Sequence, residues 1–395
     1  MQRKIHVSGV GCCLVDFLYN NIDFSSNAIC KYLSRERGDG GLIPGQLVFR
    51  EEFEKFSKSS FESFIQSVTG ERPPDKINIG GPSIVSLIHV AQLTDRNICD
   101  VRYYGRGGND DAGKYLLDSL EKTPVILGDY KLIDNQTPST FVLSDPDYDN
   151  GNGERMFINS IGAAWDFQPD DLDHNFFNSD IVVFGGTALV PAIHDHLTNL
   201  LKKARSKGCI TIVNTVFDFR NEKSNPEKRW PLGESYDSYR NIDLLITDRE
   251  EALRLSGETT VSGAIRFFLD NGTSSFIITN GSKNITLYSD GHFFKPNPLE
   301  ELPVSGKIVE ELKHHKGGDT TGCGDNFAGG VIASIADQLR DGIRKPDFME
   351  ACCLGIVSGG FACFYMGGTY DEKETGEKRS KIKPYYESYK KQVSG

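Results

Sequence analysis

The stretch Gly-Gly-Asp-Thr-Thr-Gly-Cys-Gly-Asp-Asn-Phe-Ala-Gly-Gly, residues 317–330, combines glycines, hydroxyl side chains and two carboxylates in one turn. The apolar residues 331–335 follow directly and predict that a helix starts here. Glycines at a helix start let backbone N–H groups approach an anion, and the helix dipole favours negative charge there. Asp325 lies beside those amides, where a carboxylate can deprotonate a hydroxyl as phosphate arrives. The stretch therefore predicts a site for phosphoryl transfer.

The composition is that of an ordinary globular protein. A chain of 395 residues can bury a large core, either as one α/β domain or as a core with a smaller piece. The formal net charge of -11 argues against nucleic acid or an anionic membrane surface as a partner. No segment approaches the roughly 20 apolar residues of a spanning helix, and the first residues lack the pattern of a signal peptide. We therefore expect a cytoplasmic protein.

The cysteines support this expectation. There are nine of them, with no Cys-x-x-Cys pair and no zinc-binding spacing. Cys12-Cys13 and Cys352-Cys353 lie in apolar runs, which predicts buried, reduced thiols.

Strand and helix patterns alternate through the second half of the chain. Apolar strands are predicted at 181–184, 209–213, 244–247 and 275–279, with helices between them at 193–206, 250–255 and 262–269. This rhythm predicts a doubly wound, mostly parallel sheet in a three-layer α/β/α fold. Residues 125–158 instead alternate apolar and polar positions between turn residues, which favours a small antiparallel β element.

Two common nucleotide-binding motifs are absent. The chain has no Gly-x4-Gly-Lys-Ser/Thr sequence, and Gly9-x-Gly11 continues to Leu14 rather than to a third glycine. These absences argue against a P-loop enzyme and leave at most a partial dinucleotide fingerprint. Residues 317–330 thus become the main indication of nucleotide chemistry.

Residues 319–330 resemble the C-terminal signature of the ribokinase-like (phosphofructokinase-B type) carbohydrate kinases, in which alanine is common at the position of Cys323. Further matches follow in family order: Gly9 to Asp16, Gly80-Gly81, Gly105 to Gly113, Pro138 to Thr140, Gly153 to Arg155, Gly162 to Ala164 and Thr279 to Gly281. The resemblance covers nearly the whole chain. It implies one kinase unit over residues 1–395, with lid segments near 17–81 and 125–160.

The resemblance implies roles at the phosphoryl end of the site. Asp325 matches the catalytic base, and Gly322, Cys323 and Gly324 match the anion hole, whose amides stabilise the transferring phosphoryl group. Asp319 and Thr321 resemble ligands of an activating monovalent cation, for which K+ is the candidate. ATP and Mg2+ are the implied cofactors.

Further roles concern the acceptor and the nucleotide. Asp16 matches a carboxylate that binds substrate hydroxyls, and Gly80 and Gly81 match glycines that let the sugar approach the backbone. Glu251 matches the carboxylate of a motif linked to magnesium and phosphate. Thr279 and Gly281 match the strand end on the nucleotide side, although Thr279 to Gly281 can also be a simple turn.

Other matches have simpler explanations. Asp16 can cap the element that follows the first strand, and Asn109-Asp110 reads chiefly as a helix N-cap. Arg155 reads as an exposed lid charge. The basic residues among Tyr385, Tyr386 and Tyr389 predict a solvated terminal helix.

Several departures from the family pattern concern the acceptor. Val85 occupies a position where the family usually carries asparagine, Asp248 replaces another asparagine, and Asn214 stands where many relatives have aspartate. The segment 20–76 is much longer than a minimal sugar kinase needs. These changes leave phosphotransfer intact but put ribose or fructose specificity in doubt.

The sequence therefore predicts an ATP-dependent kinase that phosphorylates a hydroxymethyl group on a small-molecule sugar or sugar derivative. An adenosine-like nucleoside is the alternative acceptor, and a kinase-like protein that binds ligand without catalysis is the alternative from a different class. We expect the lid to close over the acceptor and exclude water. An exposed antiparallel lid can also pair with a second copy, which predicts a homodimer.

Overall fold

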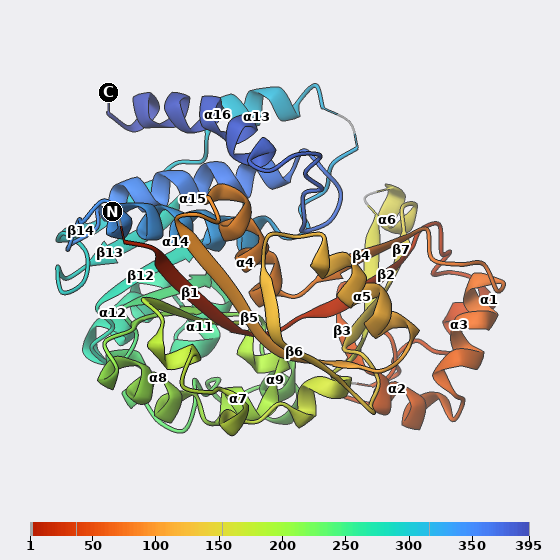
Figure 1. Cartoon of the computed structure of the whole chain (residues 1–395). Coiled ribbons are helices and arrows are strands. Elements are labelled where there is room, and N and C mark those ends of the chain that lie inside the picture. Colours follow the sequence, from red (N-terminus) through yellow and green to blue (C-terminus); the bar gives the residue numbers. More distant parts are fainter. Residues whose placement is uncertain (1–2, 37, 152, 316, 395) are drawn as a thin grey trace.

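The computed structural model describes residues 3–36, 38–151, 153–315 and 317–394, and it contains a large and a small sheet (Figure 1). The large sheet has nine strands. In spatial order these are β14 (Asn297–Leu302), β13 (Ile285–Ser289), β12 (Ser275–Thr279), β11 (Leu244–Asp248), β10 (Ile210–Asn214), β9 (Ile181–Gly185), β1 (Ile5–Gly11), β5 (Cys99–Gly108) and β6 (Ile126–Ile133). All pairs are parallel except β12–β13 and β13–β14.

Helices cover both faces of this sheet (Figure 1). One layer holds α4 (Pro82–Leu93), α13 (Gly306–Leu312), α14 (Cys323–Arg340), α15 (Phe348–Ala362) and α16 (Glu377–Ser394); the other holds α7 (Pro191–Asp195), α8 (Leu197–Ser206), α11 (Arg249–Ser256) and α12 (Val261–Asp270). Along β12, Ile277 packs into the first layer's core and Ile278 into the second, as strand alternation requires. The predicted three-layer α/β/α fold is confirmed.

The small sheet has the order β3 (Leu47–Phe49), β8 (Glu154–Ser160), β7 (Ser139–Asp145), β2 (Leu14–Tyr19) and β4 (Lys76–Gly80). It is mixed: β2–β4 and β7–β8 are antiparallel, whereas β2–β7 and β3–β8 are parallel. The predicted antiparallel element is therefore present as two hydrogen-bonded pairs within a mixed sheet. The second lid segment was expected to start near residue 125. Residues 126–133 instead form β6 at the edge of the large sheet.

The long insertion builds its own core on one face of the small sheet (Figure 1). Its helices are α1 (Asn27–Cys30), α2 (Arg50–Ser57) and α3 (Phe61–Thr69). The rings of Phe61 and Phe141 lie 4.7 Å apart, and Tyr19 and Leu143 are buried in the same cluster. The chain's own insertion therefore covers one face of the small sheet, the element through which a second copy was expected to pair.

Short elements complete the fold: α5 (Asp111–Glu121), α6 (Tyr148–Gly151), α9 (Phe219–Ser224), α10 (Asp237–Arg240), η1 (Gly162–Asp166), η2 (Pro169–Asp171), η3 (Phe176–Asn178) and η4 (Thr187–Leu189). Asp110 caps α5 by accepting a hydrogen bond from the Gly113 amide, as predicted. The helix expected over 193–206 is divided at His196 into α7 and α8. Across the described ranges, no helix is long and apolar enough to cross a membrane.

The predicted C-terminal helix is present and most of its basic residues are exposed, as expected, but one side of the helix is buried. Lys378, Ile382 and Tyr389 on α16 are each at most 1% exposed and face the α13–α15 layer. Their spacing of four and seven residues marks one helical stripe. The stripe is narrow and lies among many charged residues, so the composition of the segment does not reveal that one side of the helix is buried.

Candidate functional site

The predicted phosphate turn starts helix α14. Gly322 is its N-cap with φ 72°, a left-handed conformation that favours glycine, and a Cβ there would lie 2.4 Å from the Gly368 Cα. The following residues, Cys323 to Asp325, form the first turn, whose amides have no acceptor within the helix. Among the described residues, and apart from its chain neighbours and the backbone of its own helix, no atom lies within 4 Å of where a Cβ of Gly324 would be. The geometry suits an anion at the amide end of an 18-residue helix.

Asp325 on the first turn of α14 and Asp16 on β2 of the small sheet lie close enough for their charges to interact. Both side chains are half-buried. Burial raises the pKa of Asp325 to about 7. Burial also raises the pKa of Asp16 to about 7; a hydrogen bond with Thr140 offsets part of this rise, and the charge of Asp325 adds to it. The structure thus brings together two predicted residues that are 309 positions apart in the sequence.

The buried thiol of Cys12 lies close to both carboxylates. Burial raises its pKa, and the nearby charges of Cys13, Asp16 and Asp325 add to the rise. The apolar setting predicted for Cys12-Cys13 is confirmed.

Gly80 and Gly81 form the wall beside Asp16. A Cβ on Gly80 would lie 2.2 Å from the Asp16 Oδ2, so any side chain here must displace that carboxylate. Gly81 has φ 104°, and its Cβ would lie 2.5 Å from the Cys12 carbonyl oxygen. Both glycines are therefore needed to keep Asp16 and the first turn of α4 in place.

A polar row on the small sheet was not identified from the sequence. Asp16 is the direct cross-strand partner of Asn78 and Thr140, and Thr140 is the partner of Asn159, so the four side chains share one face. The Asn159 Nδ2 donates to the Thr140 Oγ1 at 3.0 Å. The Asn78 Nδ2 and the Asn159 Oδ1 are buried without a hydrogen-bond partner. Each residue interrupts an apolar strand, but only the sheet register shows that they align.

Asp319 and Thr321 lie in one loop close to residue 367. The Asp319 Oδ1 accepts hydrogen bonds from the amides of Thr321 at 2.9 Å and Gly367 at 3.3 Å. The carboxylate therefore ties the glycine-rich turn to the loop after α15. In the described parts of the chain, no three His, Cys, Asp or Glu side chains are grouped to hold a metal ion.

Glu251 belongs to a capping box at the start of α11. It accepts hydrogen bonds from the Asp248 amide at 3.1 Å and from the Thr215 Oγ1 at 2.5 Å. Burial raises its pKa to about 7, and the charge of Asp248 adds to the rise. Its structural role in the cap therefore accounts for much of its hydrogen bonding.

Thr279 and Gly281 lie at the end of β12, the neighbour of β11. The Thr279 Oγ1 donates to the Thr247 carbonyl at 3.5 Å, and Gly281 has φ 57°. No atom lies within 4 Å of a Cβ placed on Gly281. The turn is thus next to the strand that carries Asp248, with open space in front of the glycine.

A buried lysine, also missed from the sequence, supports the first turn of α14. The Lys378 Nζ donates to the Asn326 Oδ1 at 2.8 Å and to the Gln92 Oε1 at 3.1 Å, and burial lowers its pKa. The Asn326 Nδ2 in turn donates to the carbonyls of Gly322 and Gly368, each at 2.8 Å. Lys378 therefore fixes the side chain of Asn326, the residue next to Asp325, from the buried side of α14.

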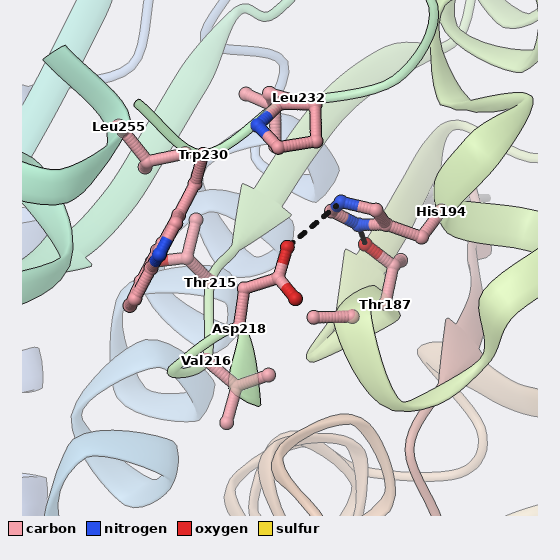
Figure 2. A pocket seen from close by; sticks show the side chains of 10 residues that line it. Thr187, His194, Thr215, Val216, Asp218, Trp230, Leu232 and Leu255 are labelled. Carbon is pink, nitrogen blue, oxygen red and sulfur yellow. Dashed lines mark hydrogen bonds and ion pairs between the residues drawn. The ribbon is translucent and has the colours of Figure 1, made fainter. Parts of the chain in front are cut away.

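A separate buried cluster surrounds His194 (Figure 2). The His194 Nδ1 lies 3.0 Å from the Thr187 Oγ1, and its Nε2 lies 3.5 Å from the Asp218 Oδ2. Burial lowers the pKa of His194, which favours the neutral ring. The adjoining cavity of about 10 Å³ has room for one water at most. The cluster is a packing feature rather than a substrate site.

The chain is similar in sequence to two characterised kinases. A cytidine kinase from Thermococcus kodakarensis is 32% identical over 95 residues, which are 24% of this chain and 30% of that enzyme. A 2-dehydro-3-deoxygluconokinase from Bacillus subtilis is 23% identical over 251 residues, which are 62% of this chain and 72% of that enzyme. The chain thus spans less than a third of the first relative and over two thirds of the second.

Solved structures show the same fold. The adenosine kinase from Sinorhizobium meliloti is 16% identical with a TM-score of 0.67, covering 96% of this chain and 99% of that one. The Arabidopsis thaliana ribokinase with ribose and ATP is 17% identical with a TM-score of 0.61, covering 97% and 99%. A structure from Escherichia coli with ATP and Mg2+ is 17% identical with a TM-score of 0.62, also covering 97% and 99%.

Residues 71–375 match the family model for pfkB family carbohydrate kinases. This match includes the glycine pair, the polar row apart from Asp16, and the whole turn that leads into α14. The chain belongs to the pfkB carbohydrate kinase family.

Proposed function

We propose that this protein is an ATP-dependent kinase that phosphorylates a hydroxymethyl group of a sugar or sugar derivative. The observation that carries the proposal is the arrangement around Asp325 and Asp16, whose charges interact. Asp325 and the first-turn amides of α14 lie on the core side, and Asp16 with its polar row lies on the lid side. One side suits a phosphoryl group and the other a molecule with several hydroxyls.

In the proposed reaction, Asp325 takes the proton of the acceptor hydroxyl. The oxygen attacks the γ-phosphorus in line, and the amides of the Gly322–Gly324 turn stabilise charge on the phosphoryl oxygens. Proton transfer typically contributes about 100- to 10,000-fold, so positioning and electrostatics supply most of the remaining acceleration. Asp16 orients the acceptor by accepting hydrogen bonds from its hydroxyls.

ATP and Mg2+ are the proposed cofactors. The lack of close neighbours at Gly324 and Gly281 leaves both backbones open to a ligand, which supports a phosphate group at the first and another part of the nucleotide at the second. Mg2+ usually keeps several waters and binds substrate phosphates with one or two carboxylates. Glu251, already bonded within its capping box, fits a role through water better than direct ligation. When bound, Mg2+ neutralises phosphate charge.

K+ is proposed as an activator near Asp319 and Thr321. Asp319 joins two loops at the start of α14, so a cation there would stabilise the turn that carries the amides. Replacing K+ by choline in the assay should lower activity if this proposal holds. Equal rates in the two salts would remove K+ from the mechanism.

The polar row favours a polyhydroxyl acceptor, because Asp16, Asn78, Thr140 and Asn159 offer both donors and acceptors on one face. The names of the relatives include sugar-acid, ribose, cytidine and adenosine kinases, so a nucleoside stays the alternative. The acidic charge and the nine free thiols support a cytoplasmic location.

The test is an acceptor panel of sugars, sugar acids and nucleosides, scored for ADP release and for a phosphorylated product by mass spectrometry. Turnover of a sugar or sugar acid that disappears in Asp325→Asn supports the proposal. Turnover of nucleosides alone would favour the alternative acceptor. ATP binding without turnover of any acceptor would favour a ligand-binding protein that lacks catalysis.

A further inference from the structure

Two cysteines meet at the base of the glycine-rich turn. Cys323 is the first residue of α14, and Cys363 is the C-cap residue of α15. Their sulfur atoms lie 3.3 Å apart, and both residues are half-buried rather than enclosed. A small reagent can therefore reach a thiol pair that already lies close to bonding distance.

The two thiols face each other within hydrogen-bonding distance, and either sulfur can be the donor. The thiolate is the reactive form in disulfide exchange, so the thiol that ionises first is the one that attacks an external disulfide. The other thiol already lies beside it and is placed to complete the exchange.

We propose that Cys323 and Cys363 form a reversible disulfide that turns the kinase site off. The oxidant is a low-molecular-weight disulfide of the glutathione type. The thiolate of one of the two cysteines attacks one of its sulfurs, forms a mixed disulfide and releases one small thiolate. The other cysteine then loses its proton and attacks the protein sulfur of the mixed disulfide, which forms the Cys323–Cys363 bond and releases the second small thiolate. Two protein thiols are oxidised and one small disulfide is reduced to two thiols.

The effect on the site follows from how tightly this region is packed. A disulfide requires sulfur atoms about 2.05 Å apart, so the present pair must move closer by about 1.2 Å. A Cβ on Gly318 would lie 1.8 Å from the Cys363 carbonyl oxygen, and one on Gly359 would lie 2.9 Å from the Cys323 carbonyl oxygen. Because the backbones already touch, the movement shifts the start of α14 or the turn before it.

The loss of activity rests on the proposed function, whereas disulfide formation does not. The amides of Cys323 and Gly324 belong to the proposed anion hole, and a displacement of about 1 Å in a catalytic site can cost on the order of 100-fold. We expect at least a tenfold fall in kcat on oxidation, reversed by dithiothreitol. The family alanine at position 323 could form no such bond.

The experiment uses the full chain, reduced with dithiothreitol and then treated with glutathione disulfide. Peptide mass mapping without reduction should find residues 323 and 363 in one crosslinked pair. Cys363→Ser should keep the activity of the reduced protein and should no longer respond to oxidant. Cys30→Ser, which removes an exposed cysteine, should respond as the wild type does.

Two results would overturn the proposal: no 323–363 crosslink under conditions that glutathionylate Cys30, or a fully crosslinked protein with unchanged kcat. A mixed disulfide that stops at Cys363 would also contradict it. If the reduced wild type phosphorylates no acceptor, the proposed kinase function is contradicted but the proposed disulfide is not. The disulfide is then tested by the crosslink map and by calorimetry of ATP binding before and after oxidation.

Discussion

Replacing Asp325 by Asn should abolish turnover and, at neutral to alkaline pH, stabilise the protein. The sequence alone predicts little change in stability, but the structure revises this expectation because burial removes the Asp325 carboxylate from water. Its pKa rises from 3.8 to about 7, so the folded protein binds this proton more tightly than the unfolded chain does. Ionisation of Asp325 therefore opposes folding.

The size of the effect depends on pH. Below about pH 4 both states carry the proton and there is no cost. As the pH rises from 4 to 7 only the unfolded chain ionises, so stability falls, and above pH 7 the full cost is present. At 1.36 kcal/mol per pKa unit the ceiling is about 4 kcal/mol. Because the side chain is half-buried, we expect about 2 kcal/mol.

The assay pairs thermal unfolding with turnover. Asp325→Asn should unfold at a higher temperature than wild type at pH 8, and the gap should close as the pH approaches 4. Activity should fall by at least about 100-fold, the lower end for loss of a general base. Asp118→Asn, which changes an exposed carboxylate on α5, should alter neither quantity. A variant with more than a few per cent of wild-type activity, or one destabilised equally at both pH values, would refute the reasoning.

Four further predictions follow from the same geometry. The wild-type kcat/KM should rise with pH through about 7, because Asp325 must be ionised to accept a proton; a flat profile between pH 6 and 8 would contradict this. Gly80→Ala should raise the acceptor KM at least tenfold, because its Cβ would meet the Asp16 Oδ2 at 2.2 Å, and KM for ATP should change little in the same steady-state measurements. Lys378→Met should lower kcat by about tenfold without unfolding the protein, as judged by circular dichroism, because it removes the support of Asn326. Lys381→Met, on the exposed side of α16, serves as the matched control and should change kcat less than twofold. Light scattering should give a monomer, because α1–α3 cover one face of the small sheet; a dimer that persists on dilution would contradict this.

The phosphate turn could be predicted because its chemistry is local. Glycines at a helix start, a carboxylate on the first turn and an apolar helix behind them all lie within residues 317–335. The parallel sheet was equally accessible, because strands buried on both faces read as short apolar runs between amphipathic helices. Those two patterns determine the fold class and the kind of reaction to be tested.

Sequence reasoning found Asp16 through resemblance but missed the row around it. Asn78, Thr140 and Asn159 come from three other strands, and a shift of one residue in any pairing would turn the side chain to the opposite face. The parallel pairing of β2 with β7 was not predicted either, since it joins segments more than 100 residues apart. Pairing between distant strands leaves no local pattern.

The sequence by itself determined the glycine-rich turn and the α/β order, and it singled out Asp325 as the base that we propose, because each is encoded by neighbouring residues. Tertiary structure alone placed Lys378 beneath Asn326, and Cys363 beside Cys323. It also packed the insertion against one face of the small sheet. The physical reason is the same in each case: burial and contact between distant segments depend on how the whole chain packs, and no short stretch of sequence carries that information.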